Sequence, residues 1–385
     1  MLSRVLPACA VVAAFFVWTV AAFTQAQSQP YAVIPRDAVN YSGPGRDTDH
    51  DLEGAEIKIG VLAPLTGSHQ NEGEALLEAA RMAIDDEAAS PLPRGRRLLI
   101  VPRDQSGPWG RAAGEIVHLV YEDKVIAILT SLDGAAAHMA EQVANKASLP
   151  IVTFATDATT TQINLPWIFR IGPTDTQQAY AFARDIYVAR RLRQAVLISE
   201  IDHDGRVGGE EFLKAARAFD APPVAQVAID PAGLNLEPVI NQIMTQKPEA
   251  LVFWTGPEIA TRLTTALRKA FPSAPLYVCR EAALPAANTD QSNIWMAASR
   301  PAESRLREAF ESRYRAQAGS DPPPAAAQAY DAVRILASAL RRCGPNRARL
   351  RDALAALSGY AGVSGAITFD HAGNDVGDVT LVRLP

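Results

Sequence analysis

The 385-residue sequence has little cysteine and no excess of basic residues. Three cysteines (9, 279 and 343) are too few for a disulfide-rich scaffold. The 37 Lys and Arg against 42 Asp and Glu give a formal net charge of -5, which argues against a nucleic-acid partner. Charged residues make up 21% and hydrophobic residues 48%, so the chain is not a disordered one. The length predicts two domains and allows three.

Sequence motifs of the common nucleotide-binding and hydrolytic sites are also absent. There is no G-x-G-x-x-G after a strand, no P-loop, no G-x-S-x-G and no H-E-x-x-H. Of the scattered histidines, His118 and His138 lie on predicted helices and are interpreted as surface or interhelical residues. His50 and His203 each sit in an Asp-His-Asp triplet, which can bind a metal but is interpreted as loop polarity. We therefore expect no metal, no cofactor and no enzymatic activity, although a triad assembled in space would escape this search.

The one long apolar run lies at the N-terminus. Residues 5–23 carry no charge and follow Arg4, which is typical of a secretory signal peptide, predicted over 1–26. An uncleaved anchor is the alternative, because 19 residues approach the roughly 20 that span a bilayer. Residues 27–55 are interpreted as an extended arm. Both interpretations predict that the mature chain works outside the cytoplasm, in the periplasm.

From residue 57 the sequence predicts strands and helices in alternation. A break at 167–175 separates two such α/β units, and the pattern predicts two doubly wound Rossmann-like lobes with parallel sheets and a central cleft. The expected strands are 57–63, 98–103, 125–129, 150–154, 194–200, 224–229, 249–254 and 275–278. The expected helices are 74–89, 111–123, 134–147, 207–219, 236–246, 257–270, 302–317, 325–342 and 347–357. Residues 367–369 and 379–384 are predicted to form a hairpin.

Several segments resemble one known family when they are taken in order. They are IKIGVLAPLTG (57–67), RDQSGP (103–108), WIFRIGPTD (167–175), AYDAVRILASAL (329–340) and GVSGAITFDHAGN (362–374). Together they are similar to the type I periplasmic binding proteins of the leucine/isoleucine/valine-binding family. The resemblance implies two lobes joined by three crossovers, near 168–173, 296–301 and 358–365. Lobe one would be 56–170 plus 300–360, and lobe two 171–299 plus 361–385.

The resemblance also implies where a ligand would bind. Glu281 falls where the family places the carboxylate that holds a ligand's ammonium group. Asp133 and Gly134 fall where the family has paired serines for the ligand carboxylate. The other implied contacts are Ala155, Thr156, Asp157 (a threonine in the family), Glu72 (an aromatic) and Asp204 (a tyrosine). Trp109 and Trp254, near strand ends, are candidates for stacking on a cation or a ring.

The acidic departures from the family pattern bear on the ligand. Ionised carboxylates offer only acceptors, so they would repel a ligand carboxylate by about 1–4 kcal/mol each at ~4 Å. Five converging acids at 72, 133, 157, 204 and 281 would favour a cationic or amine ligand, a polyol or a metal-bound species. In the alternative, some of these acids face solvent or pair with Arg280, Arg206 or Arg103.

The expected function is capture of a small solute by hinge closure and delivery to an ABC permease. The alternatives are a ligand-binding sensor that reports to a membrane partner, and an enzyme. We expect a monomer without a nucleic-acid partner. A disulfide between Cys279 and Cys343 would tie the lobes together and needs Cα atoms within ~7 Å, so two unpaired cysteines are favoured.

Overall fold

The computed structural model describes residues 41–47, 55–90, 92–107, 110–163, 165–222, 225–232, 235–282, 293–299 and 304–384. The predicted signal peptide, most of the predicted arm and Trp109 lie outside these residues. Among the described residues no helix is both long and apolar enough to cross a membrane.

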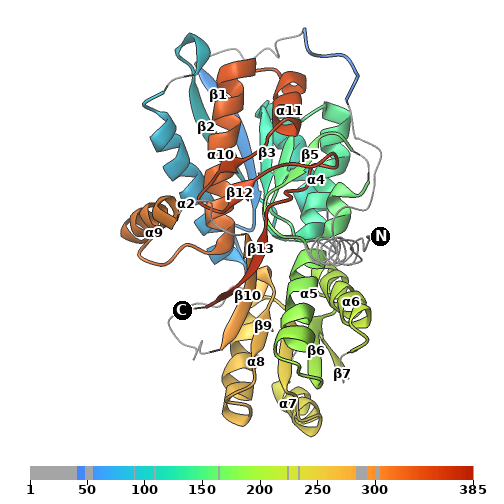
Figure 1. Ribbon diagram of the computed structural model, residues 1–385. Coiled ribbons are helices and arrows are strands. Elements are labelled where there is room, and N and C mark those ends of the chain that lie inside the picture. The colour runs from blue at the N-terminus through green and yellow to red at the C-terminus, as the bar shows by residue number, and fades with distance from the viewer. Residues whose placement is uncertain are drawn as a thin grey trace, which may run out of the picture. The chain divides into compact units, whose positions relative to one another are not determined.

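The first lobe is built on a five-stranded parallel sheet in the order β2-β1-β3-β4-β5 (Figure 1). This is one of the two common strand orders of doubly wound folds, with the switch of direction between β1 and β3. The strands are β1 (Glu56–Ala63), β2 (Arg97–Asp104), β3 (Ala127–Thr130), β4 (Ile151–Thr153) and β5 (Ile168–Arg170). The helices between them are α2 (Gln70–Glu87), α3 (Arg111–Val117), η2 (His118–Glu122) and α4 (Gly134–Ala147), with the short turns η1 (Pro93–Gly95) and η3 (Ala158–Thr161).

The second lobe repeats this topology on a six-stranded sheet in the order β13-β10-β9-β8-β6-β7. Its strands are parallel except β13, which pairs antiparallel with β10. The strands are β6 (Ala195–Glu200), β7 (Ala225–Ile229), β8 (Ala250–Trp254), β9 (Leu276–Val278), β10 (Ile294–Ser299) and β13 (Val379–Arg383). The helices are α5 (Asp175–Ala183), η4 (Arg184–Ala189), α6 (His203–Ala218), α7 (Leu236–Thr245), α8 (Pro257–Ala270) and η5 (Arg280–Ala282).

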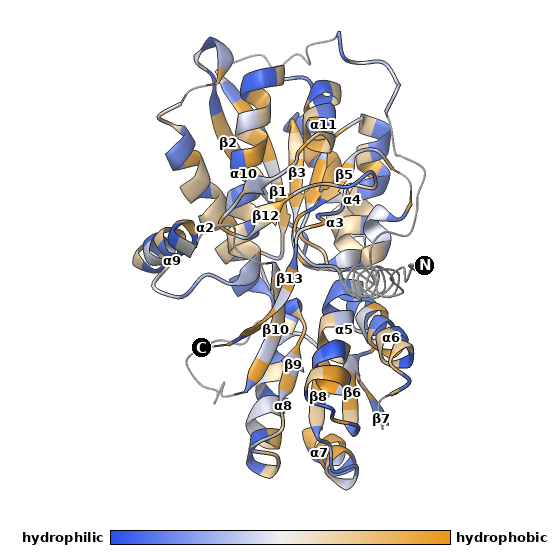
Figure 2. Ribbon diagram, in the orientation of Figure 1, coloured by the Kyte–Doolittle hydropathy of each residue, from blue (hydrophilic) through white to orange (hydrophobic). Residues whose placement is uncertain are grey.

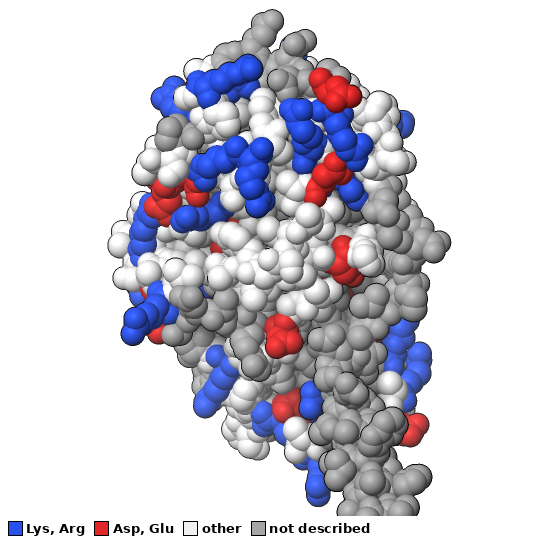
Figure 3. Space-filling view, turned by 45° about the horizontal axis from the view of Figure 1, so that its top comes forward, with Lys and Arg blue, Asp and Glu red and all other residues white. Residues whose placement is uncertain are grey.

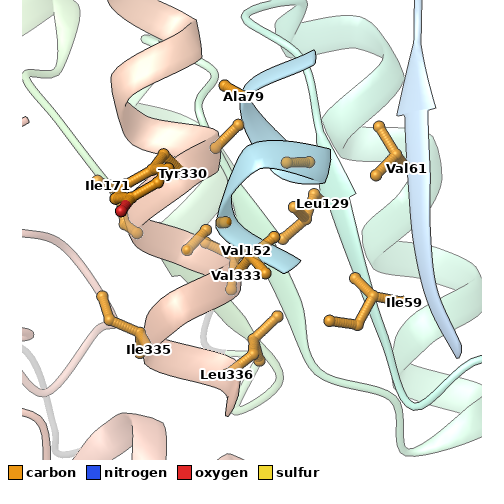
Figure 4. Close-up of a cluster of buried hydrophobic side chains, with 14 of the residues drawn as sticks. Ile59, Val61, Ala79, Leu129, Val152, Ile171, Tyr330, Val333, Ile335 and Leu336 are labelled. Carbon is orange, nitrogen blue, oxygen red and sulfur yellow. The ribbon is translucent and has the colours of Figure 1, made fainter. Parts of the chain in front are cut away.

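Three later helices return to the first lobe. They are α9 (Ser304–Ala318), α10 (Pro324–Cys343) and α11 (Arg347–Ala355), followed by the small pair β11 (Tyr360–Ala361) and β12 (Ala366–Ile367). Helix α10 packs along α2, and Figure 4 shows Val333 and Leu336 of α10 in one apolar cluster with Ile59, Leu129 and Val152 of the sheet. The first lobe is thus assembled from two distant stretches of sequence.

Alternation along β1 explains why the first sheet is covered on both faces. Ile57, Ile59 and Val61 belong to the core beneath α2 and α10, whereas Leu62 belongs to the core beneath α3 and α4. Side chains of successive strand residues point to opposite faces, so a run such as IKIGVLA supplies both cores. The apolar colouring in Figure 2 follows the strands in both lobes. The predicted α/β fold with two doubly wound lobes is confirmed.

The C-terminal part differs from the prediction in two ways. The expected hairpin of 367–369 with 379–384 does not form, because β12 pairs with β11 while β13 joins the second sheet. The chain also stays with the first lobe beyond 361: Val363 and Phe369 are in its core, and Asn374 bridges to Arg170 at the end of β5. We therefore place the proposed third crossover between residues 374 and 379, instead of at 358–365.

The two cysteines of the described residues are unpaired, as favoured from the sequence. Cys279 is buried in the core of the second lobe, and Cys343 ends α10 in the first. Each lies in its own lobe, so these two cysteines form no disulfide between the lobes.

Candidate functional site

The candidate site lies where the carboxyl ends of the two parallel sheets meet. In doubly wound sheets, ligands bind outside these ends, at the point where strand order reverses. That point lies between β1 and β3 in the first lobe and between β6 and β8 in the second. Asp133 lies in the loop after β3, and Gly134 and Asp204 lie in the first turns of α4 and α6; all three are residues implied from the sequence.

The N-terminus of α4 contacts the second lobe through a backbone amide. Asp133 is the N-cap of α4: its Oδ1 accepts from Ala136 N at 2.9 Å, and its Oδ2 accepts from Gln105 Nε2 at 3.0 Å. The next amide, Gly134 N, donates to both carboxylate oxygens of Asp204, at 3.2 and 3.1 Å. A Cβ at Gly134 would lie 2.4 Å from Asp204 Oδ1, so glycine is required for this approach. Asp133 is therefore committed to its own lobe, and Gly134 joins the two lobes.

A second contact between the lobes joins Thr156 and Glu281. Thr156 follows β4 and is buried, as is the adjacent Ala155. Thr156 Oγ1 donates to Glu281 Oε1 at 2.9 Å. Burial raises the pKa of Glu281 well above its usual range, and the nearby carboxylates of Asp204 and Asp175 raise it further. Thr156 and Glu281 thus meet directly across the lobes.

The remaining acid of the first lobe, Glu72, lies close to the same group. Its Oε1 accepts from Leu132 N at 3.2 Å, and burial raises its pKa. Burial also raises the pKa of Asp204 well above its usual range, with the charges of Asp133 and Asp175 acting in the same direction. The charges of Asp204 and Glu72 each raise the pKa of Glu281, as like charges do when they lie near one another. Convergence of Glu72, Asp204 and Glu281 is therefore supported.

One buried cation accompanies these acids. Arg280 is 3% exposed, its Nη2 donates to Gln328 Oε1 at 2.5 Å, and burial lowers its pKa to about 10. The charges of Glu281 and Glu72 act against this shift and raise the pKa of Arg280. The other two arginines considered from the sequence are engaged elsewhere: Arg103 pairs with Asp123, and Arg206 donates to the carbonyl of Asp202. Of these three arginines, Arg280 is the one that balances the charge of the acidic group.

Asp157 has a different role from the one implied. It is fully buried, and its Oδ1 accepts from Thr159 N at 2.8 Å and from Thr159 Oγ1 at 2.7 Å. Its Oδ2 lies 3.0 Å from His138 Nε2 and 2.8 Å from His203 Nε2. Burial opposes its ionisation, but these hydrogen bonds lower the pKa of Asp157 well below its usual range. Both carboxylate oxygens of Asp157 thus contact protein groups in this structure.

The two histidines beside Asp157, His138 and His203, lie at the contact between the lobes. His138 belongs to α4 in the first lobe, and His203 opens α6 in the second, so together they bridge the lobes. Hydrogen bonds with Asp157 and Glu141 raise the pKa of His138 to about 10. His138 therefore lies between helices, which is one of the two interpretations of the sequence, whereas His203 is not simple loop polarity.

Trp254 does not present its ring to a ligand in this structure. It is 1% exposed and packs among Phe182 and Phe212 in the core of the second lobe. Its Nε1 donates to Asp175 Oδ1 at 3.0 Å. We therefore remove Trp254 from the candidate contacts and add Asp175, whose pKa burial raises to about 6. Sequence reasoning missed Asp175 because it sits in the break between the two α/β units.

The surface contrasts with this buried acidic group. Figure 3 shows Lys and Arg side chains gathered toward the top, over the first lobe, with Asp and Glu scattered among them. The acids described above lie at the contact between the lobes instead of being spread over this face.

Two doubly wound lobes whose switch points face each other define a two-lobed solute-binding protein. A profile of the periplasmic binding protein family matches residues 56–384. The chain belongs to this family, and the resemblance to its type I members is confirmed. It is a family of solute-binding proteins and not a class of enzymes.

Individual relatives are distant. An amino acid binding protein of Pseudomonas aeruginosa is 26% identical over 165 residues, which is 43% of each chain. The chain spans about half or less of the length of the curated relatives it matches. The structure of LivJ of Streptococcus pneumoniae, a branched-chain amino acid transporter substrate-binding protein in complex with isoleucine, has a TM-score of 0.75 and 22% identity. The match covers 86% of this chain and 96% of that one.

A solute-binding protein of an ABC transporter from Rhodopseudomonas palustris, in complex with 3,4-dihydroxybenzoic acid, has a TM-score of 0.74 and 18% identity. The match covers 86% of this chain and 93% of that one. At these identities the likeness concerns the fold, and the ligand has to be argued from this chain's own residues.

Proposed function

We propose that this chain is an extracytoplasmic solute-binding protein, which closes its lobes around a small solute and delivers it to an ABC import permease. The observation that carries the proposal is the direct pairing of the lobes at the carboxyl ends of their strands, Gly134 with Asp204 and Thr156 with Glu281. These groups come together only when the lobes touch. A ligand that contacts groups of both lobes therefore binds the closed form more tightly, and binding shifts the population toward closure. The protein acts as a monomer in the periplasm.

The ligand proposed is a small cationic or amine-bearing solute. Asp204 already accepts from the Gly134 amide, which is the group implied to receive a ligand carboxylate. A ligand carboxylate at this place would have to displace Asp204 and then face it. An ammonium group, by contrast, gains from Glu72, Asp204 and Glu281, and it replaces the protons that their raised pKa values retain.

A thermal-shift screen of the purified protein tests this proposal. Amines, amino acids, polyols, aliphatic acids and aromatic acids are compared, and a ligand at 100 times its Kd adds about 2.7 kcal/mol. We expect the largest shift from a cationic solute. Uptake of that solute by cells should then fall when the gene is deleted.

Two variants identify which end of the ligand the site recognises. Asp204→Asn should weaken an amine about tenfold, since it removes a charge from the site. If the site instead held a ligand by its carboxylate, Asp204→Asn should strengthen that binding, because Asp204 would no longer compete for Gly134 N. The matched control is Glu258→Gln on α8, whose carboxylate is 69% exposed and pairs loosely with Arg262. Tighter binding of a carboxylate ligand to Asp204→Asn would contradict the cationic assignment.

A further inference from the structure

We propose that His138, Asp157 and His203 form a binding site for one divalent transition-metal ion, with Zn²⁺ the best fit, that spans the two lobes. The ligand atoms of these three residues all lie within 4.8 Å of one another. Two imidazoles and one carboxylate are a common donor set for zinc, whereas calcium and magnesium prefer oxygen ligands alone. The site goes beyond the proposed solute-binding function and does not depend on it.

The geometry needs little change to hold the ion. Both His138 Nε2 and His203 Nε2 face the same oxygen, Asp157 Oδ2, at 3.0 and 2.8 Å. Tetrahedral zinc with bonds of about 2.0–2.1 Å sets its ligand atoms roughly 3.3 Å apart. The rings meet edge to face, with an interplanar angle of 84° and centroids 5.8 Å apart. To reach this spacing, each nitrogen moves a few tenths of an ångström away from Oδ2, and the two ring nitrogens, which lie within 4.8 Å of each other, move closer together.

Outer contacts already orient two of the three donors. His138 Nδ1 lies 3.2 Å from Glu141 Oε2, and Glu141 is 2% exposed. This is the carboxylate–histidine arrangement that aims the other ring nitrogen at a metal. Asp157 Oδ1 is held by Thr159, which leaves Oδ2 turned toward both imidazoles. Coordination needs a neutral His138 Nε2, so binding the ion releases the proton held there.

Solvent reaches this cluster, so an ion can enter. The side chains of His138 and His203 are 27% and 36% exposed, while Asp157 is buried beneath them. Three protein ligands leave a fourth position for water. The ion would thus lie at the accessible margin of the interlobe contact, apart from the pairing of Thr156 with Glu281.

The position of the ligands couples metal binding to closure. His138 and Asp157 come from the first lobe and His203 from the first turn of α6 in the second, and α4 contacts α6. All three ligands are available only when the lobes are together. By linkage, zinc therefore favours the closed form, and the closed form favours zinc.

Titration calorimetry of metal-stripped protein without a polyhistidine tag, using Zn²⁺ alone, tests the site. We expect one ion per chain, no competition from millimolar Mg²⁺ or Ca²⁺, and at least a tenfold loss of affinity in His203→Ala and in His138→Ala. His118→Ala is the matched control, because His118 belongs to no group of metal-ligand atoms among the described residues. Its affinity should stay within about twofold.

Two results would overturn the site. One is wild-type protein that takes up no zinc, and the other is equal affinity in His203→Ala and His118→Ala. Small-angle scattering adds a readout for the bridge: zinc should shrink the radius of gyration of wild type and leave His203→Ala unchanged. Equal compaction of both would refute the interlobe assignment. Circular dichroism serves as the folding control: His203→Ala alters a partly exposed residue and should give the spectrum of the wild type. Because the probe is zinc alone, failure of the solute proposal leaves this result unaffected.

Discussion

The two lobes share one strand order but bring opposite chemistry to their contact. In each, a helix begins after the first and third strands of the unit, so four helix N-termini surround the interface. The first lobe contributes donors, Gly134 N and Thr156 Oγ1, and the second contributes the carboxylates of Asp204 and Glu281. Topology thus fixes where the site lies, while the residues of the first helical turn decide its charge.

One reversal of this polarity makes the comparison sharper. At the pairing with Asp157 the second lobe contributes the imidazole of His203 and the first lobe the acid. Each lobe therefore carries both signs, and sliding one lobe along the other would set carboxylate against carboxylate. The arrangement selects one register of closure.

The largest expected effect comes from the first crossover, which both lobes share. Gly172 has φ +102, and a Cβ there would lie 1.9 Å from Gln328 Nε2 and 2.7 Å from Arg280 Nη1. We expect Gly172→Ala to lower the free energy of unfolding by about 2–4 kcal/mol, through both backbone strain and overlap. Urea denaturation measures the change.

Gly95→Ala separates the two causes. Gly95 also has a positive φ, +68, but nothing lies within 4 Å of a Cβ there. It should cost about 1 kcal/mol, from strain alone. Equal losses in the two variants would show that the close approach at the crossover contributes nothing.

A smaller effect on lobe closure should appear when the pH is changed, because the acids of the second lobe then change their protonation. Burial in the closed form raises the pKa of Asp204, of Glu281 and, to about 6, of Asp175. The closed form then binds protons more tightly, so closure is favoured as pH falls and is lost as pH rises above these values. Each proton taken up changes the equilibrium by up to about tenfold per pH unit.

Small-angle scattering of ligand-free protein at pH 5 and pH 8 measures this equilibrium. The radius of gyration should be smaller at pH 5. The double variant Asp204→Asn with Glu281→Gln should reduce the difference, because its amides do not titrate. An unchanged pH response in the double variant would exclude these acids as its source.

The smallest effects compare equivalent helix caps in the two lobes. Asp133 caps α4 by accepting from Ala136 N at 2.9 Å, and Asp202 caps α6 by accepting from Gly205 N at 2.8 Å. Each change to Ala should cost about 1 kcal/mol of stability. Asp133→Ala should cost more of the two, since Asp133 also binds Gln105. The reverse order in thermal unfolding would mean that Gln105 adds nothing to the first lobe.

Regular elements were predictable because their signals are local. A strand such as IKIGVLA carries its alternation within a few residues, and parallel topology follows from the repeated order of elements. The destination of β13 was not predictable in this way. Its apolar alternation suits either a hairpin partner or the edge of a distant sheet, and pairing with β10 is decided by contacts 80 residues away in sequence.

Parts of the site were predictable from the resemblance, and others were not. Gly134 pairs with Asp204 and Thr156 with Glu281, and each of the four residues follows the carboxyl end of a strand. The histidine cluster joins positions 138, 157 and 203, and no spacing along the chain reveals it. Trp254 was misjudged because a strand-end position does not tell which way an indole packs.

The segregation of the first lobe's sequence has a consequence for folding during synthesis. Helix α2 cannot pack against α10 until α10 is synthesised, about 250 positions later. Likewise, the edge of β10 cannot pair with β13 until Val379–Arg383 is synthesised. A ribosome therefore releases nearly the whole chain before either lobe can complete its packing. Such long-range contacts slow folding, so the nascent protein stays incompletely packed until its last strand is synthesised.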